Sequence, residues 1–147
     1  MEIKFKKVHS IKDLAISAII LAAGIGLYFI HAGLGAFFVA CGLLMLLFYK
    51  SSYQREGDKM LLSKEAVEVS RSCKDAVMCF LEGKSSCPEL DPGNAGGIIR
   101  LEVYYNSKRA TAYAQLFDFS NYDYEPLTGI IEMHGPRVDD LLKALGK

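Results

Sequence analysis

The sequence predicts an α+β protein in which a two-helix transmembrane hairpin precedes a small antiparallel β-sheet domain with an inserted short helix and a C-terminal amphipathic helix. Three observations carry this prediction. Residues 14–49 contain no Lys, Arg, Asp or Glu. Residues 98–119 largely alternate apolar and polar side chains, as paired strands do. Residues 138–145 place apolar side chains at helical spacing. We expect an N-terminal strand or basic segment at 1–13, the hairpin at 14–49, a linker at 50–58 and the α+β domain at 59–147.

The charge-free stretch is too long for one membrane crossing. As one helix it would be roughly 54 Å long, whereas the hydrocarbon core of a bilayer is about 30 Å thick. The chain therefore has to turn back, and we expect the turn at 30–35, which holds His31, Gly33 and Gly35. His31 is expected to be an ordinary loop residue.

Small side chains recur at helical spacing along both arms of the expected hairpin. In lipid such residues let helix backbones approach closely. The alternative is that Ala and Gly are simply common in membrane helices. The residues expected to pack the arms together are Ala18, Ala22 and Gly26 on the first arm and Ala32, Ala36 and Ala40 on the second.

The distribution of basic residues predicts the topology. Lys residues precede the hairpin and Lys50, Arg55, Lys59 and Lys64 follow it, whereas its turn has no Lys or Arg. The positive-inside rule then places both termini in the cytoplasm, as in a multi-pass protein of the inner (cytoplasmic) membrane with the lipid bilayer as its first partner. A secretory signal is the alternative for the first arm, but no clear small-residue cleavage site precedes a polar segment. Neither arm carries an ionisable side chain, which argues against a channel, pump or transporter.

Residues 1–7 have the alternating pattern of an edge strand. Ile3 and Phe5 alternate with Glu2, Lys4 and Lys6. Because a hairpin returns the chain to the side it left, we expect this segment to join the cytoplasmic sheet, with its Lys-rich side exposed. The alternative is a basic tail beside anionic lipid.

The remaining elements of the domain follow from periodicity and turn residues. Apolar residues on one helical face predict a helix at 75–82 that ends near Gly83, and Pro136 is expected to open the closing helix. Four segments are predicted to be turns or loops, at 63–65, 85–97, 106–108 and 120–126. Five are predicted to be strands, at 59–62, 66–70, 99–105, 109–119 and 127–134.

Tyrosines concentrate in the predicted strands and in the loop at 120–126. Some must face the core, and the rest form an aromatic surface of the kind that protein interfaces favour. The candidates for this interaction surface are Tyr104, Tyr113, Tyr122 and Tyr124. We therefore expect a protein partner or a homo-oligomer. Nucleic acid is not an expected partner, because the 17 basic and 17 acidic residues balance and the main domain is slightly acidic.

No motif predicts a reaction, a metal site or a cofactor. Cys41 is expected to pack within the second arm, and the spacing of Cys73, Cys79 and Cys87 matches no common zinc pattern. A thiol-dependent enzyme would need one of these cysteines beside a base such as His134. The glycines of 93–97 lack the spacing of a phosphate-binding loop. The acidic residues do not follow the spacing of a calcium loop either, and they are Asp118, Asp123, Glu125 and Glu132.

The order of elements resembles small bacterial membrane proteins that carry a pleckstrin-homology-like cytoplasmic domain after two membrane helices. The resemblance is carried by 98–119, by Tyr124-Glu125-Pro126 and by the closing helix at 138–145. The helix at 75–82 departs from a plain pleckstrin-homology barrel. Because such families have no assigned reaction, the resemblance implies a binding or scaffold domain and no catalytic residue. We expect a non-catalytic membrane protein presenting that domain; the alternatives are an accessory subunit held in a larger complex by its hairpin and, third, a thiol-dependent enzyme.

Overall fold

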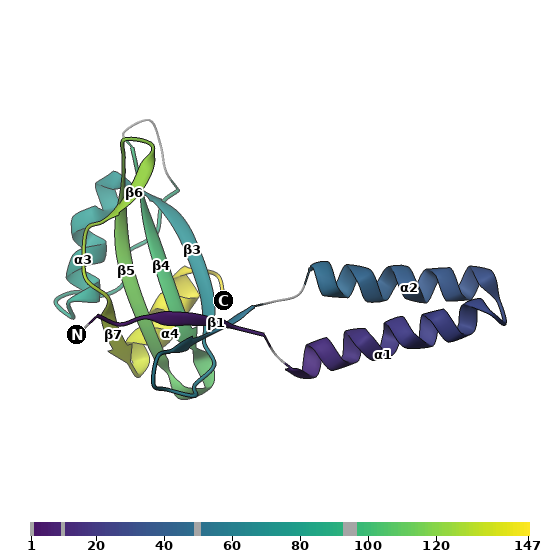
Figure 1. The fold of residues 1–147 in the computed structure, drawn as a ribbon. Helices are drawn as coiled ribbons and strands as arrows, with labels where there is room; N and C mark the ends of the chain where they lie inside the picture. The colour runs from purple at the N-terminus through teal and green to yellow at the C-terminus, as the bar shows by residue number, and fades with distance from the viewer. Residues whose placement is uncertain (1, 10, 49–50, 93–96) are drawn as a thin grey trace. The chain divides into compact units, whose positions relative to one another are not determined.

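The computed structural model describes residues 2–9, 11–48, 51–92 and 97–147 and has the α+β composition that the sequence predicts. Two N-terminal helices precede a β-sheet domain that carries two further helices among the described residues. The chain divides into two compact units, drawn in Figure 1. One, here named the helical unit, is Lys6–Ser52, and the other, the sheet unit, combines Met1–Phe5 with Tyr53–Lys147.

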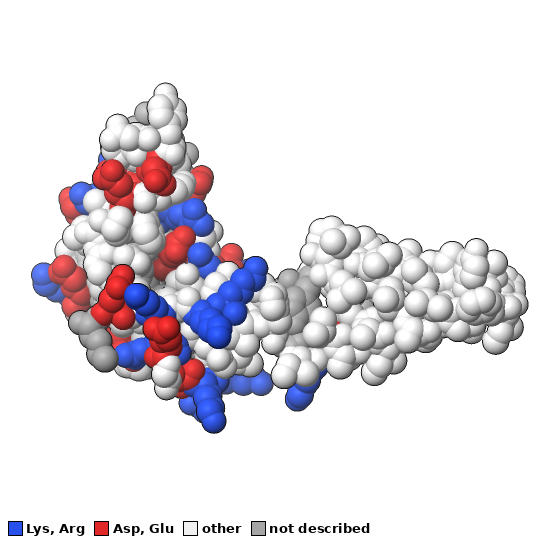
Figure 2. All heavy atoms as spheres, viewed as in Figure 1, with Lys and Arg blue, Asp and Glu red and all other residues white. Residues whose placement is uncertain are grey.

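The helical unit is an antiparallel hairpin of α1 (Ile11–Tyr28) and α2 (Ala32–Leu47). By length and composition, α1 could cross a membrane, whereas α2 is a shorter apolar helix. Lys, Arg, Asp and Glu are almost absent from the face of the unit seen in Figure 2. The chain reverses at 29–31, where the backbone N–H of His31 donates to the carbonyl of Leu27 at 2.7 Å. The turn predicted at 30–35 is therefore placed too late, because Gly33 and Gly35 already belong to α2.

Glycine brings the two helices of the hairpin into backbone contact. The residues buried between them are Ser17 and Gly24 of α1 and Gly35 and Gly42 of α2. A Cβ atom on Gly35 would lie 2.3 Å from the backbone nitrogen of Tyr28, and one on Gly24 would lie 2.7 Å from a backbone nitrogen of α2. The small residues recur every seven positions in each helix, a spacing that keeps them on one face of a left-handed crossing.

The small residues predicted to pack the arms lie on other faces. They recur every four residues and lie on exposed faces of α1 and α2. The contact between the helices instead uses the buried residues, which recur every seven positions. A Cβ atom on Gly26 would meet nothing within 4 Å. The exposed residues of the predicted set are Ala18, Ala22, Gly26, Ala32, Ala36 and Ala40.

The sheet unit is built on a five-stranded antiparallel sheet of order β3-β4-β5-β6, in which β7 also pairs with β5. A separate two-stranded sheet joins β1 (Phe5–Val8) to β2 (Ser52–Arg55). The five strands are β3 (Ser63–Ser70), β4 (Ile98–Asn106), β5 (Thr111–Ser120), β6 (Asp123–Pro126) and β7 (Ile131–His134). The helices are α3 (Lys74–Leu81) and α4 (Pro136–Ala144), with short 3-10 turns at Arg71–Cys73 and Ser107–Arg109.

Both helices of the sheet unit cover the same face of the sheet, as Figure 1 shows. This inner face follows from the alternation of the strands, since every second side chain of β4 and β5 points into the core. Arg137 ties α4 to α3, because its guanidinium donates to the carbonyl of Leu81 at 2.9 Å and to that of Phe80. The buried core residues include Ile99, Leu101 and Val103 of β4, Ala112, Ala114 and Leu116 of β5, Val77, Phe80 and Leu81 of α3, and Val138, Leu141 and Leu142 of α4.

The strongest patterns in the sequence are confirmed. The strands predicted at 99–105 and 109–119 are β4 and β5, and the predicted helices are α3 and α4. Gly83 has a φ of +79° just after α3, the left-handed backbone that glycine favours after a helix. Pro136 is the first residue of α4, where its missing N–H costs nothing.

Three segments predicted to be irregular contain strand residues. The turn predicted at 63–65 belongs to β3, because these residues pair with β4 and contain neither Gly nor Pro. Before it, the strand predicted at 59–62 is reduced to one bridge, between Tyr53 and Leu62. The linker predicted at 50–58 contains β2, and the loop predicted at 120–126 contains β6. The loop predicted at 85–97 has no helix or strand between 85 and 92, and 93–96 lie outside the described residues.

The N-terminal segment alternates as predicted but has a different partner. Ile3 and Phe5 are half-buried, and Glu2, Lys4 and Lys6 are exposed. The strand begins only at Phe5 and pairs with β2 rather than with the five-stranded sheet, and Met1 lies outside the described residues. Just before the strand, the carbonyl of Lys4 accepts a hydrogen bond from the N–H of Glu56 at 2.9 Å.

Candidate functional site

The face of the sheet opposite α3 and α4, here named the outer face, carries the polar and aromatic side chains of the central strands. Two of the rows of paired residues that cross it carry aromatic side chains. One runs from Lys64 through Tyr104 to Tyr113, and the other runs from Glu68 through Arg100 to Phe117. The first row lies toward the β4–β5 turn and the second toward the β5–β6 hairpin.

The row at Tyr104 is closed by aromatic packing from two distant segments. The ring of Phe5 stacks on Tyr104 with 4.0 Å between centroids, and it meets the edge of Tyr113 at 5.4 Å. Tyr53 of β2 meets Tyr104 at 5.3 Å. These contacts leave Tyr113 only 2% exposed. Aromatic pairs of this geometry contribute about 0.5–1.5 kcal/mol beyond area burial, so this half of the outer face stabilises the unit.

Two cations border the closed half, and both are paired with carboxylates. Arg55 lies 5.7 Å from the centroid of Tyr113 and 3.8 Å from the carboxylate of Glu132. A hydrogen bond with Tyr113 raises the pKa of Arg55. Burial works against the charge on Lys64, but Tyr104 and then Glu102 outweigh it and raise the pKa of its ammonium group. Both side chains therefore stay charged and paired and offer no free acid or base.

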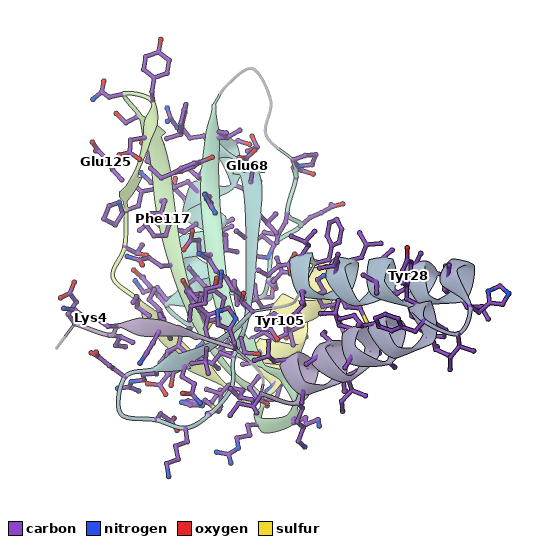
Figure 3. All side chains as sticks on the ribbon, turned by 45° about the vertical axis from the view of Figure 1, so that its right-hand side comes forward. Lys4, Tyr28, Glu68, Tyr105, Phe117 and Glu125 are labelled. Carbon is purple, nitrogen blue, oxygen red and sulfur yellow. The ribbon has the colours of Figure 1, made fainter. Side chains whose placement is uncertain are left out.

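The second row forms an open aromatic half of the outer face. The hydroxyl of Tyr124 donates to Glu68 Oε1 at 2.8 Å, and the guanidinium of Arg100 lies 5.0 Å from the Tyr124 ring. Phe119 adds a ring 5.2 Å from that of Tyr124. The hydrogen bond to Glu68, with a smaller effect of burial, raises the pKa of Tyr124. Figure 3 shows Glu68, Phe117 and Glu125 toward the end of the sheet that carries the β5–β6 hairpin, away from Lys4 and Tyr105.

The β5–β6 hairpin extends the open half. Ser120 pairs with Asp123, so only Asn121 and Tyr122 make the turn, and their φ angles are +51° and +63°. Positive φ at both central residues is the requirement of a type I′ turn, whose twist matches that of a hairpin. Tyr122 is 98% exposed. The hairpin therefore projects a tyrosine that no other part of the unit covers.

An open groove of about 440 Å³ borders the outer face beside the N-terminal segment. Its lining residues are Glu2, Ile3, Gln115, Gly129 and Ile130. The amide of Gln115 already donates to the carbonyl of Thr128 at 2.9 Å. The lining supplies one carboxylate and aliphatic surface, and neither a nucleophile nor a paired base is among these residues.

The residues weighed for catalysis have other contacts. His134 Nδ1 lies 3.3 Å from the hydroxyl of Thr111, and Nε2 lies 3.1 Å from Glu132. Burial raises the pKa of the Cys87 thiol, with a smaller effect of Asp140, which disfavours the reactive thiolate. Within the described ranges, which omit 93–96, no cluster of three His, Cys, Asp or Glu side chains could hold a metal ion.

Two of the acidic residues considered for a calcium site, Asp118 and Asp123, make local contacts. Asp118 pairs with Arg71 at 2.5 Å, and the carboxylate of Asp123 accepts the N–H of Tyr124 at 2.8 Å. These contacts give both carboxylates a local structural role, at the end of β5 and in the β5–β6 hairpin.

The four candidate tyrosines divide into two pairs. Tyr104 and Tyr113 lie in the closed half, whereas Tyr122 and Tyr124 lie in the open half and its hairpin. Sequence reasoning missed Phe5 as the residue that covers the first pair, although its place in the alternation of 2–6 marks it as facing inward. No protein-family model matches this chain, and no curated protein or solved structure matches it either. Function is therefore inferred from geometry and chemistry.

Proposed function

We propose that this chain is a non-catalytic integral membrane protein whose hairpin inserts into the inner membrane and whose sheet unit is a cytoplasmic binding domain. The observation that supports it most strongly is the inverted packing of the helical unit. Hairpins in water place large apolar side chains at the helix contact and polar ones outside. Here the contact holds glycine, and the large apolar side chains point outward.

The outward surface of the hairpin suits lipid rather than water. Phe37 is 62% exposed and Leu47 is 78% exposed, and other large apolar residues of both helices are exposed as well. Exposed apolar area costs about 25 cal/mol per Å² in water, and soluble proteins rarely expose more than a few hundred Å² in one patch. Lipid removes this cost, and close backbone contact through small residues is the usual way that membrane helices associate.

The lengths of the helices are compatible with insertion. The 18 residues of α1 span about 27 Å and the 16 residues of α2 about 24 Å, near the 30 Å of a hydrocarbon core. The apolar residues Phe29 and Ile30 in the turn and Phe48 after α2 extend the apolar surface at both ends. Small differences in length are accommodated by tilt and local thinning of the bilayer.

The open half of the outer face supports binding rather than catalysis. It combines aromatic rings with charged groups that already have partners. The guanidinium of Arg100 lies over the Tyr124 ring, and Glu68 accepts a hydrogen bond from the Tyr124 hydroxyl. Aromatic side chains and Arg are enriched at protein interfaces. The resemblance of the sequence to membrane hairpin proteins with a pleckstrin-homology-like domain is in line with this proposal.

A second function, an accessory subunit held through its hairpin, is favoured by one observation. Ala18, Ala22, Ala36 and Ala40 are exposed on faces that the hairpin contact does not use. Small residues on a lipid-facing surface would let another membrane helix approach. Exchanging the hairpin for an unrelated one separates the two functions: partners that co-purify through the sheet unit are retained, and partners bound through the hairpin are lost.

Site-directed labelling tests the membrane topology. The four native cysteines are replaced by Ser, and single cysteines are introduced as His31→Cys in the turn, Tyr122→Cys in the β5–β6 hairpin and Lys147→Cys at the C-terminus. A membrane-impermeant thiol reagent should label position 31 in intact cells and should label positions 122 and 147 only after permeabilisation. Labelling of 122 or 147 in intact cells, or release of the chain from membranes by alkaline carbonate, would contradict the proposal.

A further inference from the structure

The β5–β6 hairpin ends in a side chain that the fold does not use. Tyr122 is 98% exposed, and its φ of +63° is in the left-handed region. An L-residue with a large side chain pays a steric penalty there, and glycine is the residue most favoured at the second position of a type I′ turn. A tyrosine that the turn conformation disfavours and that is not packed points to a role outside the fold, since strained positions concentrate at functional sites.

The residues that flank Tyr122 in the β5–β6 hairpin are mainly apolar and acidic. Phe119 is exposed, and it pairs across the hairpin with Tyr124. Residues 117–126 contain three acidic side chains and no Lys or Arg. Asp118 is neutralised by Arg71, whereas the side chains of Asp123 and Glu125 are exposed. In Figure 2 the tip of the hairpin is white, and acidic side chains lie directly below it.

We propose that Tyr122 is the anchor through which the sheet unit binds a protein partner, and that the partner receives it in an apolar pocket rimmed by Lys or Arg. The proposal rests on the binding role of the sheet unit proposed above. Tyr is enriched among residues that dominate binding energy, and it loses little side-chain freedom when it is immobilised. Phe119 would extend the apolar contact, and Asp123 and Glu125 would pair with the basic rim.

The acidic flank favours a protein over a lipid surface. Cytoplasmic leaflets carry anionic lipids, which attract Lys and Arg and repel carboxylates. The same carboxylates attract a basic rim on a protein, where complementary charge speeds association and sets orientation. Binding to a lipid surface is therefore the alternative, and the experiment below reveals it as an adduct with lipid.

Photo-crosslinking of the full chain in its native membrane finds the partner. A benzophenone amino acid is introduced at position 122 and, as a control, at Lys108, an exposed residue of the β4–β5 turn at the other end of the sheet. We expect an adduct with one protein from position 122 and none from position 108. Absence of an adduct at 122, an adduct with lipid, or an adduct between two copies of this chain overturns the proposal.

Affinity then decides whether the adduct reports an anchor. With the purified partner and the detergent-solubilised full chain, Tyr122→Gly should weaken binding about 30-fold, as removal of a dominant interface residue does, and Tyr122→Phe should stay within about threefold. Combined Asp123→Asn and Glu125→Gln should weaken binding and reduce its salt dependence. Because the turn favours glycine, Tyr122→Gly should melt at the same temperature as the parent or higher, so its loss of affinity cannot come from unfolding. Unchanged affinity of Tyr122→Gly overturns the proposal.

Alkaline extraction of the same membranes separates this proposal from the membrane proposal. A chain that resists extraction but gives no adduct refutes the anchor and leaves the membrane hairpin standing. A chain that is extracted but gives the expected adduct and affinities refutes insertion and leaves the anchor standing.

Discussion

The contact at Gly35 gives the most direct test of how the hairpin packs. A Cβ atom there would lie 2.3 Å from the backbone of Tyr28, whereas ordinary van der Waals contact begins at 3.4 Å. A methyl group alone would therefore force the helices apart by about 1.1 Å, the difference between these two distances. Gly35→Leu adds three further carbons at a place where the nearest atoms are the backbone N and Cα of Tyr28, which cannot turn away. The neighbouring Ala36→Leu places the same side chain on an exposed face and is the matched control.

Overpacking of a close contact typically costs about 1–3 kcal/mol. Amide hydrogen exchange in α1 and α2 of the detergent-solubilised chain reports this loss, since exchange rates rise about tenfold for each 1.4 kcal/mol of lost local stability. We expect faster exchange across both helices in Gly35→Leu and less than a twofold change in Ala36→Leu. Equal effects of the two substitutions, or a larger effect at Ala36, would refute glycine-mediated packing and restore the alanine-lined contact that the sequence suggests.

Two further predictions concern the outer face. Phe5→Ala should lower the free energy of unfolding of the sheet unit by about 2 kcal/mol, less than the 3–5 kcal/mol of a fully buried phenylalanine because Phe5 is half-buried. Urea unfolding of the solubilised chain measures this loss, and Lys6→Ala is the exposed control. A loss below about 0.5 kcal/mol would show that the stacked ring adds little. Because Glu68 raises the pKa of Tyr124, their hydrogen bond should stabilise the hairpin below the ordinary tyrosine pKa of about 10 and be lost as pH rises through the raised value. Phenolate absorbance follows this titration; Glu68→Gln should move it to lower pH, Tyr124→Phe should remove it, and an unchanged titration in Glu68→Gln would refute the coupling.

The elements that sequence predicted well are those whose pattern carries both type and boundary. Alternation in β4 and β5 fixes which residues face the core, and Pro136 with the apolar stripe of α4 fixes where the last helix begins. The hairpin that follows β5 was missed because its turn lacks the usual signal. Asn121 is a common first residue of a type I′ turn, but the second position holds Tyr122 instead of glycine, so the segment looks like a polar loop.

The helix contact was placed on the wrong face for a different reason. Apart from Lys12 and Asp13 at the start of α1, both helices are apolar all round, so hydrophobic periodicity cannot indicate which side meets the partner. Two sets of small residues then compete: the alanines at four-residue spacing, and the pairs Ser17 with Gly24 and Gly35 with Gly42 at seven-residue spacing. Only the second set is buried in the hairpin, and its glycines remove the Cβ atoms that would otherwise collide. A seven-residue repeat of glycine and serine was the signal available in the sequence.

Alternation along a strand predicts which face a tyrosine occupies and leaves open what covers that face. Tyr104 and Phe117 project from the same face of neighbouring strands, yet Phe5 reaches only the first of them. The cover comes from the other end of the sequence, so no local pattern around Tyr104 could reveal it. The closed half that Phe5 covers supports the β5–β6 hairpin, because β5 runs through both halves of the face. A side chain at the end of that hairpin, such as Tyr122, is held by a strand whose other half is locked in the core, and this is the pre-organisation that a binding residue on a short turn requires.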